Sequence, residues 1–338
     1  MPELRRNMAT GEWVVLATER AKRPEEFSRR AAVTTELPAR MSNCPFCQGN
    51  ESMTPPALAQ IGDGKTWRIR VVNNAFGAFS TTGSLSPRGN EYMRSIDAVG
   101  HHEVIIQTPA HNKPEPLLDP EQMRDIVLMY RDRHRFMEGD PRVELIIPFK
   151  NHGLMAGTSL VHPHAQIAGV PIVPTHLVHR TEEPLHYYRE QRSCVFCAML
   201  AEEMKAGERI VEENEAFVAL IPFAAATPFE TWIIPRAHRP SFGAIDDGEA
   251  HLFASLLRSV LRRLYYGLQN PDYNYMIRSA PREHREAPFL HWYAKIIPRL
   301  TKVAGFEMGT GMFINTARSE ESAEFLRGVK ESAADSRG

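Results

Sequence analysis

No stretch of the 338-residue sequence approaches the roughly 18 consecutive apolar residues of a membrane-spanning helix. The N-terminus lacks the apolar core of a signal peptide, and a formal net charge of -1 gives no reason to expect nucleic acid or an anionic membrane as a partner. These absences predict a cytoplasmic protein. The composition, 43% hydrophobic and 24% charged residues, is typical of a globular protein, and the length favours two domains.

Cysteine is also scarce. The four cysteines form two pairs, Cys44 with Cys47 and Cys194 with Cys197, and two residues separate the members of each pair. In a reducing cytoplasm, such pairs are more often metal ligands or redox dithiols than structural disulfides.

Two histidines stand close together at His162 and His164, with a single proline between them. In an extended segment successive side chains alternate between faces, so both imidazoles would point to the same side. Imidazole is a common metal ligand and a competent nucleophile near neutral pH, so one histidine can bind a metal while its neighbour reacts. Taken alone, the triplet is equally compatible with a loop that carries two exposed histidines.

Four motifs that recur in one order indicate that the chain consists of two duplicated halves. In the first half they are Cys44 with Cys47, Asn73 to Phe76, Glu103 with His111, and His162; in the second half they are Cys194 with Cys197, Asn214 to Phe217, Glu230 with His238, and His291. Tyr293 replaces His164 in the second half. This asymmetry predicts one catalytic repeat, residues 1–170, and one degenerate, structural repeat, residues 171–338.

Each half combines short β-rich runs with one amphipathic helix. The β-rich runs cover residues 104–107, 143–147, 232–234 and 273–277. One helix is predicted to begin at Asp119-Pro120 and its counterpart near Asp247, each followed by apolar residues at helical spacing. The proline-containing segments 24–38 and 171–184 are predicted to be loops, and residues 321–329 a helix with Ser319 as its N-cap.

Each half also contains two thiols and two imidazoles in corresponding places. This is a closed, tetrahedral set of the kind that zinc prefers, so we expect two structural zinc ions per chain, although the histidines can instead cap strands and the cysteines can be buried apolar residues. If His162 is a ligand, the metal anchors the strand that carries His164. The predicted ligands are Cys44, Cys47, His111 and His162 in the first half, and Cys194, Cys197, His238 and His291 in the second.

Polar groups around His164 suit the transfer of a phosphoryl group. Gly157 lets the backbone approach a ligand closely, and Ser159 and Gln166 can donate hydrogen bonds to phosphoryl oxygens. Arg20 and Arg23 concentrate positive charge near the N-terminus, either as a solvated basic turn or as phosphate contacts.

These motifs resemble the galactose-1-phosphate uridylyltransferase family of the histidine-triad superfamily, over nearly the whole chain. The resemblance rests on Gly11 to Val15, Arg20 to Pro24, Cys44 to Cys47, Thr108 to His111, Asn151 to Gln166, and Leu300 to Glu307. It implies an α+β fold of two tandem histidine-triad-like repeats, each an antiparallel sheet with packed helices. It also implies a homodimer whose sites borrow residues from the partner chain.

The resemblance further implies a double displacement, in which His164 attacks the α-phosphorus of a nucleotide sugar and passes the nucleotidyl group to a second phosphate. Ser159 and Gln166 would hold the phosphoryl oxygens. The implied substrate-binding residues are Arg20, Arg23, Asn74, Phe76, Asn151, Gly157, Lys302, Gly305, Phe306 and Glu307.

Three departures from the family pattern are similar to a related branch, ADP-glucose phosphorylase. Glu25, Glu26 and Phe27 follow the Arg-Pro pair where the family has Trp; the second half has a cysteine pair where an iron site is frequent; and residues 305–315 replace the family's Gly-Tyr-Glu segment. The first expectation is uridylyl exchange between UDP-glucose and galactose 1-phosphate. Adenylyl transfer from ADP-glucose to phosphate is the alternative, followed by nucleotide-sugar hydrolysis and a non-catalytic, zinc-stabilised nucleotide-binding protein.

Overall fold

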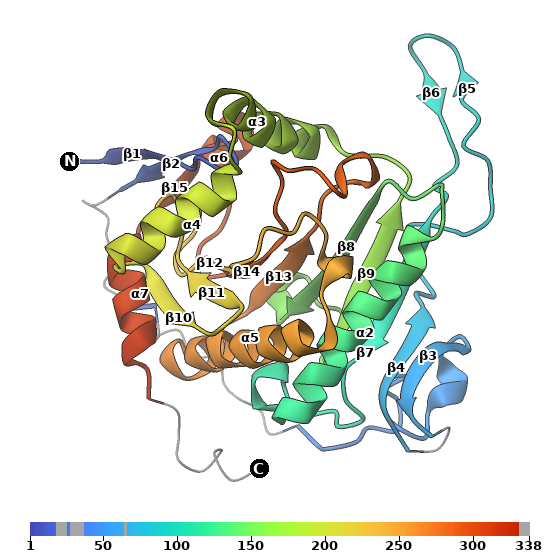
Figure 1. The fold of residues 1–338 in the computed structure, drawn as a ribbon. Helices are drawn as coiled ribbons and strands as arrows, with labels where there is room; N and C mark the ends of the chain where they lie inside the picture. The colour runs from blue at the N-terminus through green and yellow to red at the C-terminus, as the bar shows by residue number, and fades with distance from the viewer. Residues whose placement is uncertain (18–25, 28–36, 64–65, 331–338) are drawn as a thin grey trace.

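A ten-stranded antiparallel sheet forms the centre of the computed structural model, which describes residues 1–17, 26–27, 37–63 and 66–330 (Figure 1). From one edge to the other the strands are β10 (Ile210–Glu213), β11 (Phe217–Leu220), β12 (Thr231–Pro235), β14 (Tyr293–Pro298), β13 (Tyr273–Arg278), β8 (Leu145–His152), β9 (His164–Val170), β7 (His101–Ile106), β4 (Trp67–Asn73) and β3 (Ala57–Gly62).

The sheet consists of two five-stranded halves that meet where β8 pairs with β13, with Tyr273 opposite His152. Reading outward from this seam, each half has the same order of strands in the chain, so the halves are structural repeats. The predicted α+β fold with antiparallel sheets and packed helices is confirmed. The two halves form one continuous sheet because β8 and β13 would each be an edge strand in an isolated repeat. The unpaired backbone groups of such edge strands favour pairing with another strand.

Helices α2 (Pro120–Glu138) and α5 (Asp247–Gly267) pack side by side on one face of the sheet (Figure 1). Both begin as predicted. The Asp119 carboxylate accepts a hydrogen bond from the Gln122 amide at 2.8 Å, and Asp246 forms a capping box with Glu249. Their apolar stripes are buried against the sheet in the main core of the molecule.

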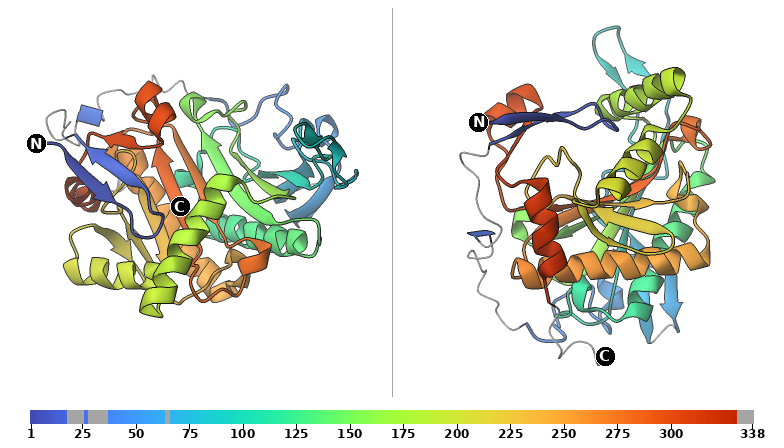
Figure 2. Two further views of the ribbon diagram at one scale, coloured as in Figure 1. Left: turned by 90° about the horizontal axis from the view of Figure 1, so that it is seen from above. Right: turned by 60° about the vertical axis from the view of Figure 1, so that its left-hand side comes forward.

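The opposite face of the second half is covered by α4 (Val195–Ala206), whose Phe196 and Leu200 pack on side chains of β11, β12 and β14. Helix α3 (Thr175–Gln191) precedes it in the chain. A separate sheet of β1 (Glu3–Arg6), β2 (Trp13–Leu16) and β15 (Phe313–Asn315) lies at the N-terminal end of the molecule (Figure 2). Helices α6 (Gly305–Thr310) and α7 (Ser319–Gly328) flank β15 in the chain.

Helix α3 contradicts the prediction of a loop over residues 171–184. Pro174 is the N-cap of this helix, and Pro184 lies inside it. An internal proline removes one backbone donor, but Pro184 is buried, so packing offsets that loss. The terminal helix α7 is confirmed, although Ser319 is its first residue rather than its N-cap, and its hydroxyl donates to the Pro222 carbonyl at 2.8 Å. Most of the other predicted loop, 24–38, lies outside the described residues.

The sheet register corrects two of the four motif matches. Asn73 is the last residue of β4, whereas Asn214 precedes β11, so the two Asn-x-Ala-Phe runs are not equivalent. Val104 pairs with Gln166 in the first half, as Trp232 pairs with Lys295 in the second. Glu230 is therefore equivalent to His102 and not to Glu103. The loop that leads to His238 is one residue shorter than the loop that leads to His111. This difference makes the Glu-to-His spacing the same in both halves, although Glu103 and Glu230 are not equivalent.

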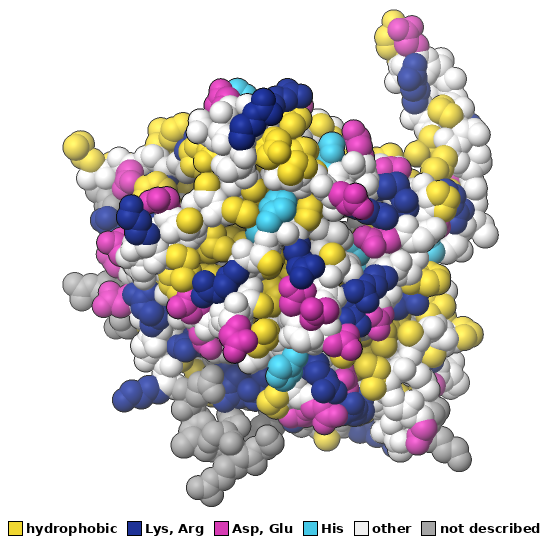
Figure 3. Space-filling model, in the orientation of Figure 1, with side chains coloured by type: hydrophobic (Ala, Val, Ile, Leu, Met, Phe, Trp, Pro, Cys, Tyr) yellow, Lys and Arg dark blue, Asp and Glu magenta, His cyan; other side chains and the backbone are white. Residues whose placement is uncertain are grey.

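A hairpin of β5 (Arg88–Gly89) and β6 (Arg94–Ser95) projects from the body, as Figure 1 shows. On the face seen in Figure 3, basic and acidic side chains are interspersed, in keeping with the small net charge. Among the described residues, no helix combines the length and the apolar character needed to cross a membrane.

Candidate active site

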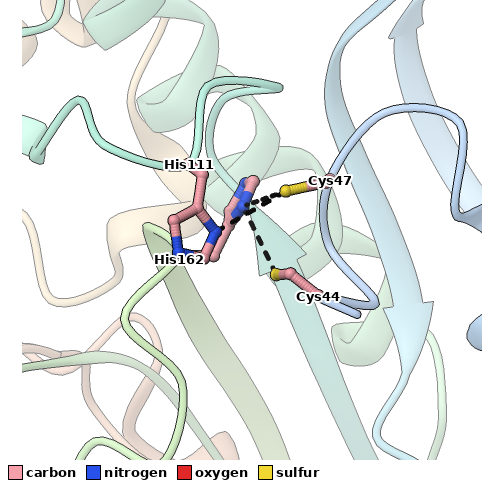
Figure 4. Close-up of side chains that lie close together, drawn as sticks. All are labelled: Cys44, Cys47, His111 and His162. Atoms are coloured by element: carbon pink, nitrogen blue, oxygen red, sulfur yellow. Dashed lines mark hydrogen bonds between the residues drawn. The ribbon is translucent and has the colours of Figure 1, made fainter. Parts of the chain in front are cut away.

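The four predicted ligands of the first half converge in one cluster (Figure 4). Cys44 and Cys47 come from the loop before β3, His111 follows β7, and His162 immediately precedes β9. All four ligand atoms lie within 4.8 Å of one another, and His162 Nδ1 lies 3.7 Å from the Cys44 sulfur and 3.6 Å from the Cys47 sulfur. Such separations fit ligands arranged tetrahedrally about an ion at roughly 2.0–2.3 Å from each.

The second cluster reproduces this geometry. Cys197 Sγ lies 3.5 Å from His238 Nδ1 and 3.6 Å from His291 Nδ1, and Cys194 completes the group. Cys194 is the N-cap of α4, so both thiols lie at the positive end of a helix, which favours thiolates. The second cluster is less enclosed, because His238 is exposed and Cys197 is half-buried.

Backbone carbonyls orient one histidine of each cluster in the same way. His162 Nε2 lies 2.7 Å from the Thr108 carbonyl oxygen, and His291 Nε2 lies 2.9 Å from the Pro235 carbonyl oxygen. A carbonyl can only accept a hydrogen bond, so Nε2 carries the proton and Nδ1 presents its lone pair to the sulfurs. This arrangement is typical of a histidine that binds a metal.

His164 is the first residue of β9, and its ring orientation leaves one nitrogen available for chemistry. His164 Nδ1 donates to the His162 carbonyl at 2.8 Å, so the lone pair is on Nε2. Burial, with the nearby Lys150 ammonium, lowers the pKa of His164 to about 4. A neutral imidazole at neutral pH is the form that acts as a nucleophile.

His164 lines a pocket of about 520 Å³ together with the predicted residues Asn74, Phe76, Ser159 and Gln166. Phe76 is 95% exposed, so its ring is available to a planar ligand. The structure thus brings the predicted nucleophile and the predicted phosphoryl-binding groups into one cavity.

The side chain of Gln166 is held in a defined orientation. Its oxygen accepts a hydrogen bond from His102 Nε2 at 2.8 Å and another from Asn74 at 3.2 Å. His102 Nδ1 in turn accepts from the Ala78 amide at 3.0 Å. With the oxygen of Gln166 occupied, the group that it presents to a ligand is its NH₂ donor.

Asn151 and Gly157 lie on either side of the short segment that leads from β8 toward β9. Asn274 of β13 donates to the Asn151 side-chain oxygen and to the Ala156 carbonyl, both at 2.8 Å. Gly157 has a φ of +84°, which favours glycine, and a Cβ at this position would meet no neighbouring atom within 4 Å. A residue of the second repeat therefore supports the loop between β8 and β9 in the first.

The remaining predicted residues are not brought to His164 within the described chain. Lys302 and Glu307 line another pocket, and the Glu307 carboxylate accepts from the Ala304 amide at 3.0 Å as part of the capping of α6. Gly305 and Phe306 belong to the same short helix. The basic residues predicted near the N-terminus, Arg20 and Arg23, lie outside the described residues.

Sequence reasoning did not identify two residues that hold the His164 backbone and the Gln166 side chain. Lys150 Nζ donates to the His164 carbonyl at 3.0 Å and to Gln107, and it is buried beside Glu115 at 3.5 Å. His102 orients Gln166 as described above. Alternation along the strands gives a partial signal for both, because lysine and histidine are unusual on buried strand faces.

A neutral histidine beside hydrogen-bond donors in one pocket suits the chemistry of a nucleotidyltransferase. Comparison with known proteins agrees. The sequence model for the galactose-1-phosphate uridyl transferase N-terminal domain matches residues 1–174, and the model for the C-terminal domain matches residues 181–336. The chain belongs to the galactose-1-phosphate uridylyltransferase family.

Two relatives span nearly the whole chain. ADP-glucose phosphorylase from Arabidopsis thaliana is 35% identical over 97% of this chain and 93% of its own length. Galactose-1-phosphate uridylyltransferase from Thermotoga maritima is 29% identical over 97% of this chain and 98% of its own length. A crystal structure of the Arabidopsis ADP-glucose phosphorylase with bound ADP-glucose superposes with a TM-score of 0.84, at 33% identity over 98% of this chain and 99% of that chain.

Proposed function

We propose that this protein transfers an adenylyl group from ADP-glucose to phosphate, the reaction class of an ADP-glucose phosphorylase. The observation that carries the nucleotidyl transfer is the orientation of His164, whose Nε2 lone pair lies in the pocket with Ser159 and Gln166. Adenine is favoured by the 35% identity to the Arabidopsis ADP-glucose phosphorylase, and by the three departures from the family pattern.

The reaction proceeds in two displacements. His164 Nε2 attacks the α-phosphorus of ADP-glucose, the bond from that phosphorus to the bridging oxygen breaks, and glucose 1-phosphate leaves. An oxygen of inorganic phosphate then attacks the same phosphorus, the phosphorus–nitrogen bond breaks, and ADP leaves with neutral His164 regenerated. Gln166 and Ser159 donate hydrogen bonds to the phosphoryl oxygens, whose charge rises in each transition state.

We also propose zinc as the ion in both clusters, because two thiolates and two imidazoles suit that metal. A closed set of four protein ligands gives each ion a structural role. In the first half, His162 ties the start of β9 to the cluster and so fixes the position of His164.

A homodimer would complete the active site. Lys302, Gly305, Phe306 and Glu307 lie away from the pocket of His164 in one chain, and we propose that they read the sugar in the site of a second copy. Arg20 and Arg23 are proposed to contact phosphates, whereas Asn74 and Phe76 would contact the nucleoside.

Uridylyl exchange between UDP-glucose and galactose 1-phosphate is the second candidate. It is supported by the matching family models and by the similarity to the Thermotoga enzyme over the whole chain. The diphosphate contacts do not separate the two functions, because UDP-glucose and ADP-glucose present the same diphosphate. Discrimination therefore falls to the pocket around Asn74 and Phe76.

Intact mass spectrometry after brief incubation with each nucleotide sugar tests the proposal. ADP-glucose should give an adenylyl adduct that phosphate discharges as ADP, and the His164→Gly variant should give no adduct while keeping its fold and metal content. An adduct from UDP-glucose alone, discharged by galactose 1-phosphate, would overturn the adenylyl assignment. Normal turnover by His164→Gly would refute the double displacement.

A further inference from the structure

The second repeat contains its own polar pocket, at the place where the first repeat has its active site. Sheet register makes Tyr293, Lys295 and Glu230 the equivalents of His164, Gln166 and His102. In the first repeat, His102 and Gln166 are hydrogen-bonded at 2.8 Å. The equivalent residues of the second repeat also interact, since Lys295 Nζ lies 2.8 Å from the Glu230 carboxylate. The nucleophile is lost, but the site has been rebuilt with charged groups.

Positive charge exceeds negative charge in this pocket, which has a volume of about 230 Å³. Apart from Lys302 and Glu307, which are assigned above to the site of a second copy, its lining includes four cationic and two acidic side chains: Arg180, Arg278, Lys295 and Arg299 against Glu12 and Glu230. Two of the inner cations have partners, since Arg180 binds Glu12 at 2.6 Å and Lys295 binds Glu230. The volume is several times the roughly 30 Å³ share of one water molecule, enough for a small hydrated anion.

Arg278 is the unusual member of the group. It lies on β13 directly opposite Tyr293, and its side chain makes no hydrogen bond or ion pair with any described residue. It faces another guanidinium, that of Arg180, and burial together with this neighbour lowers the pKa of Arg278. The nearby carboxylates, Glu12 and Glu230, form ion pairs with Arg180 and Lys295, which leaves the Arg278 guanidinium without an ion pair of its own, an unfavourable arrangement unless an anion joins it.

Polar atoms without partners gather around the same cavity. Arg278 Nε, Arg180 Nη1, Glu230 Oε2 and Thr227 Oγ1 are all buried without a hydrogen bond from a described residue, and all four residues line this pocket. Buried polar groups in proteins are nearly always satisfied, so a cluster of exceptions indicates a missing occupant. Water can satisfy the hydroxyl and the carboxylate, but it does not neutralise the excess positive charge.

We propose that this pocket binds a phosphate group, as a second anion site separate from that of His164. The forked guanidinium groups of Arg180 and Arg278 suit the oxygens of a phosphate, and Lys295 adds a point charge. Glu230 and Thr227 offer acceptors beside these cations, which suits the hydroxyls of a sugar phosphate. The bound group would join α3, β13 and β14 at one point.

Equilibrium dialysis with labelled inorganic phosphate tests the site on the full-length protein. The Arg278→Met variant should bind one phosphate fewer per chain than the unmodified protein. His164→Gly should keep this phosphate, as should the control Arg189→Met, which removes an exposed arginine from the same helix as Arg180. Equal stoichiometry and affinity in Arg278→Met and the unmodified protein would overturn the proposal.

Thermal unfolding provides a second readout, in which removal of a partly buried side chain is expected not to lower the melting temperature. In phosphate-free buffer, Arg278→Met should melt at or above the temperature of the unmodified protein, because it removes an unpaired, partly buried cation. Phosphate at ten times its dissociation constant should raise the melting temperature of His164→Gly by on the order of 3 °C, and the double variant with Arg278→Met should not respond. If Arg278→Met melted at a much lower temperature than the unmodified protein in phosphate-free buffer, the claim that Arg278 is unpaired would be contradicted.

A crystal of the unmodified protein soaked in sodium tungstate locates the anion without any variant. Strong density between Arg180 and Arg278 is expected, whereas an acidic side chain of a second copy in that position would refute a phosphate site. Glucose 1-phosphate and inorganic phosphate distinguish the source of the ligand. At least tenfold tighter binding of glucose 1-phosphate, lost in Arg278→Met, would assign a sugar phosphate, and equal binding would assign phosphate itself.

Discussion

Replacing Lys150 with methionine should damage both the stability and the chemistry of the protein. The Lys150 ammonium is 2% exposed and lies 3.5 Å from Glu115, which is fully buried. Glu115 also accepts a hydrogen bond from Tyr275 at 2.7 Å, within a buried polar network that reaches the start of β9 through Lys150. Methionine keeps the length of the side chain but leaves the Glu115 carboxylate without its counter-charge and the His164 carbonyl without its donor.

Removing one partner of a buried ion pair costs about 3–5 kcal/mol of unfolding free energy. For a chain of this size, that loss corresponds to a fall in melting temperature of roughly 5–15 °C. Lys150→Met should also slow formation of the covalent adduct, because the backbone of His164 is less firmly held. Urea unfolding and a quenched-flow adduct assay measure the two effects.

Glu115→Gln in the Lys150→Met background should recover most of the lost stability, because a neutral amide carries no charge to desolvate. It should not restore the adduct rate, since the His164 carbonyl still lacks its donor. Lys205→Met, at an exposed lysine, is the control and should shift stability by at most about 0.5 kcal/mol. A loss below about 1 kcal/mol in Lys150→Met, or strictly additive losses in the double variant, would refute the reasoning.

The remaining predictions concern pH and metal. Burial, with repulsion from Arg285 and Arg135, lowers the pKa of His134 from 6.5 to about 3, so the folded state binds fewer protons than the unfolded state below pH 6.5. The free energy of unfolding should therefore fall as pH drops from about 6.5 toward 3. In denaturant titrations, the free energy of unfolding of His134→Phe should fall by about 2 kcal/mol less than that of the unmodified protein between pH 7 and pH 5. An unchanged pH profile in that variant would contradict this assignment. Cys44→Ser should lose about one metal ion per chain by elemental analysis, together with adduct formation, because its cluster anchors His162. Cys194→Ser should also lose about one metal ion and melt at a lower temperature but keep adduct formation, and unchanged metal content in either variant would count against its cluster.

Local features of the sequence predicted much of this fold. Asp119 and Asp246 begin the two long helices because their carboxylates satisfy backbone donors within three residues, which is information carried by the local sequence. Helix α3 was missed because Pro184 is a strong local signal for a break, whereas the packing that keeps the helix intact is tertiary. Continuity of the sheet across β8 and β13 also depends on contacts between distant segments.

The candidate site divides in the same way. The sequence pointed to both cysteine–histidine clusters and to His164 because cysteine pairs and a repeated histidine are rare and have few structural uses. His102 was missed because its role depends on a cross-strand neighbour, Gln166, that lies 64 residues away in the chain. The charges at Arg278 and Lys295 gave no signal, because each is an ordinary residue until the sheet places them side by side.

The pairing of β8 with β13 determines what the protein gains from being one chain. If the two repeats were separate polypeptides, this contact would be a subunit interface, and its occupancy would fall on dilution. A covalent linker holds the two strands at a high effective concentration, so their association does not depend on how much protein is present. The second repeat is then a permanently attached subunit, free to diverge in chemistry so long as its inner strand continues to support the loop before His164.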